Sequence, residues 1–352
     1  MNVIQKMLRD YYEIIEYDIK PRPVVMENID KVINCGAPSY GGAMYGCPHC
    51  GNLKFVPFRC HSKFCPSCGA KYSNDRSTAM SFKLIQSTHR HLVFTIDESL
   101  RRFSSKTALC LTAFSRLFLM SSKNIFSLNK SKNFVPGFIC VLHTFGRPLG
   151  WNPHIHCLLT EGGFSDDGVW CKVTYFNYSY LRKSFQTVLL NKLEKRIGPS
   201  FKKMKAAVYH RDRNGFYVYA KPNLCDPKSI IKYVSRYLGR PVIALSRIDS
   251  YNGEMVTFHY NKHEDNSFVQ KTLPAIDFIK LLILHIPEKN FKMTRYYGLY
   301  ARHREIDNQL HKAVPKSKHR ILLDFNTWRK LSFLPWGTTS CNAQTADMKW
   351  SF

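Results

Sequence analysis

The segment GFICVLHTFGRPLGWNPHIHCLLT, residues 137–160, joins two apolar, β-rich runs through a loop that contains glycine and proline. This pattern predicts a β-hairpin. Alternate residues of a strand point to the same face of a sheet, so the imidazoles of His154 and His156 are expected to project together, with Ile155 on the opposite face. Two imidazoles arranged in this way could bind a divalent metal ion and leave some of its coordination positions open.

His143 lies on the first strand of the same hairpin. Pairing across the loop can bring its ring beside His154 and His156. Three histidines around an ion with open positions suit a metal that polarises a phosphate oxygen. The alternative is that these are ordinary core histidines, because the chain has 14 histidines and a His-x-His sequence also arises by chance.

The composition indicates a folded protein that binds a polyanion. The chain has 352 residues, 44% of them apolar, and its 52 basic against 25 acidic side chains give a net charge of +27. This excess argues against an enzyme of small neutral metabolites and favours nucleic acid, with an anionic membrane surface second. No apolar run reaches the roughly 20 residues that span a bilayer, and the N-terminus lacks a secretory signal. We therefore expect a cytoplasmic protein, in which clustered cysteines indicate metal.

Two cysteine pairs of the form Cys-x-x-Cys, Cys47 with Cys50 and Cys65 with Cys68, are separated by 14 residues. We expect these four thiolates to hold a structural Zn²⁺ ion, because each pair presents two sulfurs from one tight turn. A closed four-ligand site has no position for catalysis. Four nearby residues are alternative ligands: Cys60, His61, Cys35 and His49. The module would present basic side chains to DNA: Lys54, Arg59, Lys63, Lys71 and Arg76.

A second candidate reactive element lies downstream of the hairpin. A helix is predicted to begin at Asp226, a good N-cap residue, and to end at Gly239. Tyr233 and Tyr237 are four residues apart and share one face of this helix. A phenol is a poor nucleophile unless a metal, an arginine or a base lowers its pKa, and Arg236 could also bind phosphate. The alternative for both tyrosines is packing in the core.

In this order along the chain, the motifs resemble the rolling-circle HUH transposases of bacterial insertion sequences, in the two-tyrosine branch that is related to Helitrons. The resemblance runs through Cys47–Cys68, the histidine hairpin with Glu161-Gly-Gly163, Tyr233–Pro241 and Tyr296–Tyr300. It implies an α+β fold with a ferredoxin-like HUH endonuclease palm, a small zinc-ribbon-like module and a basic C-terminal region.

The resemblance also implies a division into domains. Residues 1–78 would hold the N-terminal helices and the zinc module, 79–248 the catalytic domain, and 249–352 a basic, DNA-binding region. Further elements follow from local patterns. Helices are predicted over 3–17, 25–33, 179–197 and 273–285, and strands over 91–96, 206–210, 215–220 and 255–260.

The activity that the resemblance implies is metal-dependent cleavage of single-stranded DNA and strand transfer through a 5′-phosphotyrosine. The paired histidines carry over to His154 and His156, which would hold Mg²⁺ or Mn²⁺, and the tyrosines carry over to Tyr233 and Tyr237. Some members take a third ligand from the helix, four residues after the nucleophile. Here Pro241 stands four residues after Tyr237 and cannot ligate. His143 is therefore the favoured third ligand, with His91 as the substitute.

The implied partners are single-stranded DNA and transposon-end DNA in the bacterial cytoplasm, in association with the nucleoid. Neither a membrane nor a small-molecule substrate is implied. Three basic segments are expected to follow DNA phosphates: residues 202–205, 302–304 and 312–320. One alternative is a plasmid replication initiator or relaxase with the same chemistry. Another is a non-catalytic zinc-containing protein that binds nucleic acid. The cysteine module and the absence of a GxxxxGK[ST] motif favour the transposase.

Overall fold

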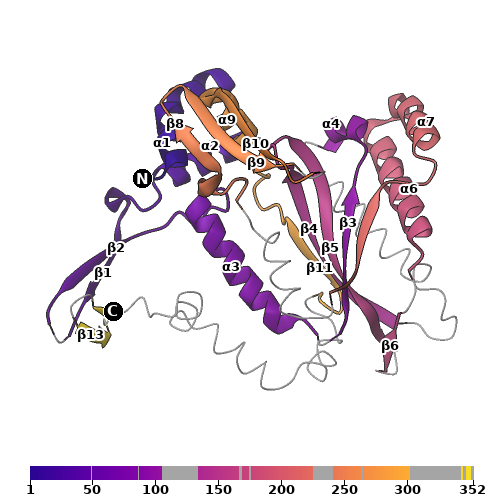
Figure 1. Cartoon of the computed structure of the whole chain (residues 1–352), viewed down its shortest axis with the longest axis horizontal. Helices are drawn as coiled ribbons and strands as arrows, with labels where there is room; N and C mark the ends of the chain where they lie inside the picture. Colours follow the sequence, from indigo (N-terminus) through magenta and orange to yellow (C-terminus); the bar gives the residue numbers. More distant parts are fainter. Residues whose placement is uncertain are drawn as a thin grey trace.

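The computed structural model describes residues 1–48, 50–85, 87–104, 134–165, 169–173, 176–224, 241–262, 265–301, 342–343 and 346–349. Helices and antiparallel strands are mixed within these ranges, so the fold is α+β, as expected (Figure 1). The predicted tyrosine helix falls outside the described residues. No helix in the described ranges has both the length and the apolarity that a bilayer crossing requires.

A six-stranded antiparallel sheet forms the centre of the molecule. Its strands are β3 (His89–Thr95), β4 (Phe134–Phe145), β5 (Trp151–Ser165), β6 (Trp170–Lys172), β7 (Val218–Leu224) and β11 (Thr294–Gly298). Their order is β11-β4-β5-β3-β7, with β6 paired to β5. The predicted hairpin is confirmed, and both of its strands, β4 and β5, are interior strands of the sheet.

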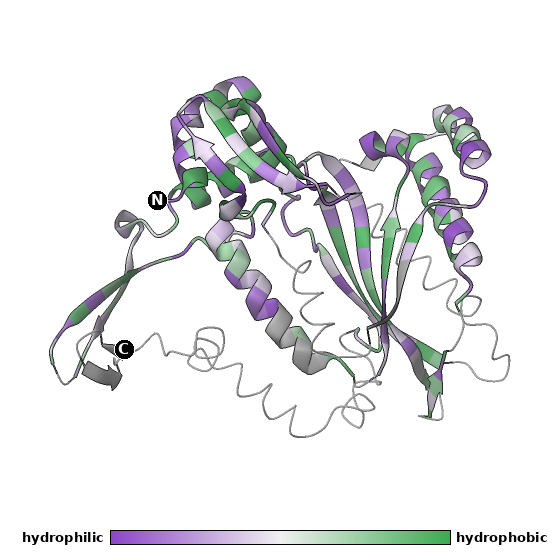
Figure 2. Cartoon of the chain, in the orientation of Figure 1, coloured by the Kyte–Doolittle hydropathy of each residue, from purple (hydrophilic) through white to green (hydrophobic). Residues whose placement is uncertain are grey.

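One face of the sheet packs against α6 (Tyr178–Ile197) and α7 (Lys202–Arg211). Fully buried side chains from both layers meet there, among them Phe94, Ile155 and Phe185. Figure 2 shows hydrophobic stretches along the strands of this sheet. The strand predicted over 206–210 is wrong, because this segment is the end of α7. Its apolar run is short enough to fit either period, and only Val208 is fully buried.

The opposite face of the sheet packs against α3 (Pro66–Lys83). Met80 near the end of this helix lies in a cluster with Ile139, Val141 and Leu158. These three positions alternate along β4 and β5 with the residues that face α6, so α3 and α6 lie on opposite sides of the sheet. The helix runs from the cysteine-rich segment down toward one end of the sheet (Figure 1).

A second lobe combines the N-terminus with residues from the middle of the chain. Its elements are α1 (Val3–Asp10), a π-helical turn (Ile14–Ile19), α2 (Pro23–Ile33), β8 (Ile248–Tyr251), β9 (Met255–Asn261), β10 (Phe268–Pro274) and α9 (Ala275–Ile283). Met7 and Ile29 share one hydrophobic core with Phe258 and Phe278. The domain boundaries at residues 78 and 248 remain a prediction, and this core joins segments on both sides of them.

The described chain also contains a protruding hairpin and three further short helices or strands, besides 3-10 helical turns. They are β1 (Gly42–Gly46), β2 (Leu53–Pro57), α4 (Arg101–Ser104), β12 (Asn342–Ala343) and β13 (Ala346–Lys349). The β1–β2 hairpin extends away from the N-terminal lobe (Figure 1).

The motif Tyr296–Tyr300 begins in β11, an edge strand of the sheet, and continues into the turn that follows it. Tyr297 stacks on Phe138, with ring centroids 4.9 Å apart, and Tyr300 contacts the buried His89, with 2.6 Å between Oη and Nε2. The turn between these contacts requires glycine. Gly298 has a φ of +57°, and a Cβ there would lie 1.7 Å from the carbonyl oxygen of Pro136.

Candidate metal centres

The β4–β5 register brings three histidines to one face of the sheet. His143 lies directly opposite His154, and His156 is two residues further along β5. One ring nitrogen from each lies within 4.8 Å of those of the other two. The ring centroids are 4.6 Å apart for His143 and His156, 4.9 Å for His154 and His156, and 5.5 Å for His143 and His154. The structure therefore brings together the three histidines that the sequence singled out. We call this group the histidine triad.

Burial favours the neutral, metal-binding form of two members of the triad. His143 and His156 are buried. Burial lowers the pKa of His156, and its histidine neighbours lower it further, while burial also lowers the pKa of His154. Neutral imidazole is the ligand form, so these shifts favour coordination. The Nδ1 atom of His154 lies 2.7 Å from the carbonyl oxygen of Asn152 and must donate to it, which leaves Nε2 as the atom with a lone pair.

His91, the substitute ligand, lies behind the triad. It stands on β3, and its Nε2 is 3.1 Å from Nδ1 of His156. The two rings are nearly parallel, with centroids 5.3 Å apart. His91 does not join the triad among the described residues. It is in position to fix the orientation of the His156 ring.

A buried histidine that sequence reasoning missed holds the turn of the hairpin. His285 follows α9, and its Nε2 donates to the carbonyl oxygen of Leu149, 2.8 Å away. Its Nδ1 lies 3.0 Å from the hydroxyl of Thr144, and its ring stacks on Trp151. His285 thus ties the second lobe to the strands of the triad. Its only sequence signal is a polar residue within an apolar run.

The state of His285 makes the stability of the fold depend on pH. Burial lowers its pKa from 6.5 to about 4. Below pH 6.5 the unfolded chain binds a proton here that the folded chain does not, so stability is lost as the pH falls toward 4. Full loss of this contribution amounts to about 3 kcal/mol. We expect the free energy of unfolding of the wild type to fall by about 3 kcal/mol more than that of His285→Gln between pH 7.5 and 4, as measured by urea unfolding. His210→Gln, at an exposed histidine, is the control. Equal losses in the wild type and His285→Gln would contradict this role.

The predicted nucleophile segment cannot be placed, because Tyr233, Tyr237 and Arg236 lie outside the described residues. Its two ends are visible. The chain leaves β7, which pairs with β3 beside the triad, and it re-enters at Pro241. A Cβ built on Gly69 of α3 would lie 3.5 Å from Cβ of Pro241. The segment therefore connects an edge of the sheet to the helix that covers the triad face.

Four cysteines converge at the start of α3, and they are Cys35, Cys60, Cys65 and Cys68. Their sulfurs lie within 4.8 Å of one another, with 3.6 Å between Cys35 and Cys68, 3.7 Å between Cys60 and Cys68, and 3.8 Å between Cys65 and Cys35. Four sulfurs arranged tetrahedrally at about 2.3 Å from a zinc ion are about 3.8 Å apart, so the group fits Zn²⁺. We call this group the cysteine quartet.

The quartet differs from the expected ligand set, since it includes Cys65 and Cys68 but neither Cys47 nor Cys50. The latter pair lies in the turn of the β1–β2 hairpin, which carries it away from the other four. Cys35 takes part instead because it directly follows α2. Among the alternatives raised from sequence, Cys60 and Cys35 are in the quartet, His61 is outside it, and His49 lies outside the described residues.

One thiol of the quartet loses its proton more readily than the others. The pKa of Cys65 is lowered to about 5, first by a hydrogen bond with Cys60 and then by backbone N–H groups at the start of α3, although burial opposes this. The pKa of Cys60 is raised by the same contact. One thiolate is thus favoured before any metal binds, which helps a cation to enter.

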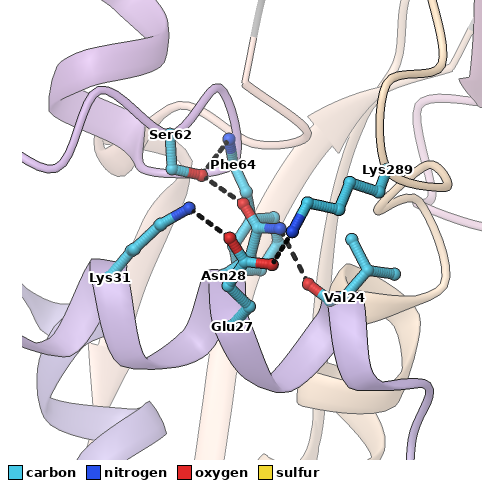
Figure 3. Close-up of polar contacts among 7 residues, drawn as sticks. All are labelled: Val24, Glu27, Asn28, Lys31, Ser62, Phe64 and Lys289. Carbon is cyan, nitrogen blue, oxygen red and sulfur yellow. Dashed lines mark hydrogen bonds and ion pairs between the residues drawn. The ribbon is translucent and has the colours of Figure 1, made fainter.

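Polar contacts fix the loop that supplies two of these cysteines. The Ser62 hydroxyl donates to the side-chain oxygen of Asn28 on α2, 2.7 Å away, and accepts from the backbone N–H of Phe64 (Figure 3). The Asn28 amide also donates to the carbonyl of Val24. The loop between Cys60 and Cys65 is thereby tied to the same helix that Cys35 follows.

Comparison with known sequences gives matches over both groups of ligands. Residues 4–96 match the family described as "Transposase zinc-binding domain", and residues 137–307 match the family described as "Putative transposase". The first range contains the cysteine quartet, and the second contains the histidine triad. No solved structure matches the chain.

Two curated relatives are similar over most of their length. The "Transposase for insertion sequence element IS801" of Pseudomonas savastanoi pv. phaseolicola is 28% identical over 298 residues, which cover 80% of this chain and 71% of that protein. The "Putative transposase y4qJ" of Sinorhizobium fredii (strain NBRC 101917 / NGR234) is 28% identical over 301 residues, 77% of this chain and 73% of that protein.

These matches identify the class of protein as a transposase with a zinc-binding N-terminal domain, and each matched range contains one of the two ligand groups. The chain belongs to the transposases of bacterial insertion sequences, as its motifs indicated.

Proposed function

We propose that this transposase acts by the rolling-circle route. It cleaves one strand of DNA, holds the cut end as a 5′-phosphotyrosine and transfers it to a new site. The observation that supports this most strongly is the convergence of His143, His154 and His156, whose ring nitrogens lie within 4.8 Å of one another on one face of the sheet. The sheet is the HUH palm in this proposal, and the substrate is single-stranded transposon-end DNA.

The triad would hold Mg²⁺ or Mn²⁺. Three neutral imidazoles leave positions free for a phosphate oxygen and water, and of the two ions Mn²⁺ accepts nitrogen donors more readily than the harder Mg²⁺. A divalent ion there supplies polarisation of the scissile phosphate and offsets its developing charge. The protein contributes a fixed geometry, because His91 contacts His156 and a backbone carbonyl accepts from His154.

One of Tyr233 and Tyr237 would attack the phosphorus of a phosphodiester. Its oxygen forms the new bond to phosphorus as the phenolic proton passes to water. The bond from phosphorus to the 3′ oxygen breaks, and that oxygen takes a proton from water to become a free 3′-OH. The energy of the phosphodiester is conserved in the tyrosine ester, so a later 3′-OH can reverse the step without ATP. The other tyrosine would accept the second end. The two ends of the 225–240 segment, at β7 and beside α3, are consistent with tyrosines over the triad face.

The quartet would hold a structural Zn²⁺ ion. Four thiolates close the coordination shell, so this ion has no position for a substrate, and its role is to join α2 to the start of α3. We retain residues 1–78 as the zinc-binding part, 79–248 as the catalytic part and 249–352 as a basic DNA-binding part.

A cleavage assay with a labelled oligonucleotide tests this function. Single-stranded DNA that contains the element's end should be cut in Mg²⁺ or Mn²⁺ and left intact with EDTA, and the same sequence as a fully paired duplex should be cut far more slowly. Binding without any cleavage would favour the non-catalytic alternative. Cleavage that persists with EDTA would rule out the role proposed for the triad.

A further inference from the structure

Two cations converge on one tyrosine of α3, and one of them, Lys63, lies in the loop between the quartet ligands Cys60 and Cys65. The Nζ atom of Lys63 lies 4.5 Å from the centre of the Tyr72 ring. The guanidinium carbon of Arg76 lies 5.5 Å from the same centre, and its Nε donates to the Tyr72 hydroxyl at 3.0 Å. Lys63 is exposed, while Tyr72 and Arg76 are half-buried. We call these three residues the α3 cation cluster.

Among the residues that the structure describes, no carboxylate neutralises this cluster. Within the described part of the chain, neither Lys63 nor Arg76 forms an ion pair with an aspartate or glutamate. The neighbouring carboxyl, Asp75, interacts with Lys71 instead. Burial alone would raise the pKa of Tyr72, yet the two cations lower it below its usual value. Two like charges, one of them half-buried, with no carboxylate partner in the described ranges favour the binding of an anion.

The cluster faces the side of the sheet that carries the histidine triad. Arg76 is one helical turn from Met80, which packs on that face against Ile139. Tyr296 pairs opposite Ile139 and is close enough to Arg76 to raise its pKa, after the larger effect of Tyr72. Ile139 lies four residues before His143 on β4, and even spacing along a strand puts the two on the same face.

The donors suit a phosphodiester. A guanidinium with further N–H groups, an ammonium and a hydroxyl can all bind the oxygens of one phosphate. The occupant that the charge fits is a DNA strand, because the chain carries a net charge of +27 and is a transposase. A strand that crosses the triad face would meet α3.

We infer that Lys63, Arg76 and Tyr72 bind a backbone phosphate of the single-stranded substrate at a position away from the scissile bond. This inference rests on the proposed function for the identity of the strand. The cluster would fix the register of the strand, since phosphate contacts position a nucleic acid without reading its sequence.

A phosphate-by-phosphate substitution tests this site. Binding of single-stranded end DNA is measured without divalent metal, for the intact strand and for strands with one neutral methylphosphonate linkage at each position in turn. At one position, the neutral linkage is expected to weaken binding by the wild type about tenfold. The same linkage should weaken binding by Lys63→Gln/Arg76→Gln less than twofold, because that variant no longer contacts the phosphate that the linkage neutralises. The slope of log affinity against log salt should also be shallower by about 0.7 for each phosphate that the double variant no longer binds.

The control variant removes two positive charges from residues outside the α3 cation cluster. Lys183→Gln/Lys195→Gln alters two exposed lysines of α6, on the opposite side of the sheet from α3, and should keep the full penalty at that linkage. Tyr72→Phe keeps both cations and should weaken binding only a few-fold. It provides a second test if the double variant does not fold. A linkage penalty that is unchanged in Lys63→Gln/Arg76→Gln, or in Tyr72→Phe where that variant is the one tested, would overturn the inference. The cleavage assay on the wild type is independent, so the proposed function can fail or stand separately.

Discussion

Replacing His156 with alanine is expected to reduce strand cleavage by at least about 10²–10³-fold, the scale on which removal of a single charge-stabilising group acts in an active site. His156 is the central member of the triad, with its ring closest to both His143 and His154. Its removal leaves two ligands and also removes the contact between His156 and the His91 ring. The affinity for Mn²⁺, measured by calorimetry, should fall together with the cleavage rate.

The matched control for this variant is His259→Ala. His259 lies on β9 and pairs with Asp249 at the surface, 2.6 Å away. This change should leave both Mn²⁺ affinity and cleavage close to those of the wild type. If His156→Ala cleaved DNA at the wild-type rate while it folded normally, the triad would not be the metal site of the reaction.

The second large effect concerns the cysteine quartet. Cys65→Ser should lose the bound zinc, about one ion per chain, because three sulfurs remain of a four-ligand site. Structural zinc contributes about 10–16 kcal/mol in zinc-finger peptides, which is as large as the whole stability of a typical domain. Cys65 and Cys68 lie in the core that joins α1 and α2 to α9, so this lobe should unfold when the ion is lost.

Cys47→Ser is the control that separates the two ligand sets. Cys47 is buried in the turn of the β1–β2 hairpin, outside the quartet. We expect it to keep the zinc content, measured by elemental analysis, and the melting temperature of the wild type. Equal loss of zinc from Cys47→Ser and Cys65→Ser would restore the ligand set that the two Cys-x-x-Cys pairs predict.

The parts of the fold that local periodicity controls could be predicted from the sequence. Alternation along β4 and β5 put His143, His154 and His156 on one face, because a hairpin fixes register over a short loop. The helix over 179–197 was predicted within one residue of α6. The helix α7 was not, since its short apolar run fits two periods.

Contacts between distant segments could not be predicted in this way. Nothing local indicates that Met7 packs in one core with Phe278, or that His285 binds the turn of the histidine hairpin. The zinc ligand set also depends on contacts between distant segments. Spacing favours Cys47 and Cys50 as a pair, but the length of the β1–β2 hairpin removes them from the quartet, and Cys35 enters because α2 ends beside the loop.

The central claim is that the triad directs a tyrosine of the 225–240 segment to a DNA phosphate, and adduct mapping tests it most directly. The protein is incubated with Mn²⁺ and a single-stranded end oligonucleotide, denatured, digested with protease and nuclease, and analysed for phosphorylated tyrosine by mass spectrometry. The account predicts an adduct at Tyr233 or Tyr237 that is absent in His156→Ala and in the double variant Tyr233→Phe/Tyr237→Phe. An adduct that persists in the double variant, or that maps to a tyrosine elsewhere in the chain, would contradict it.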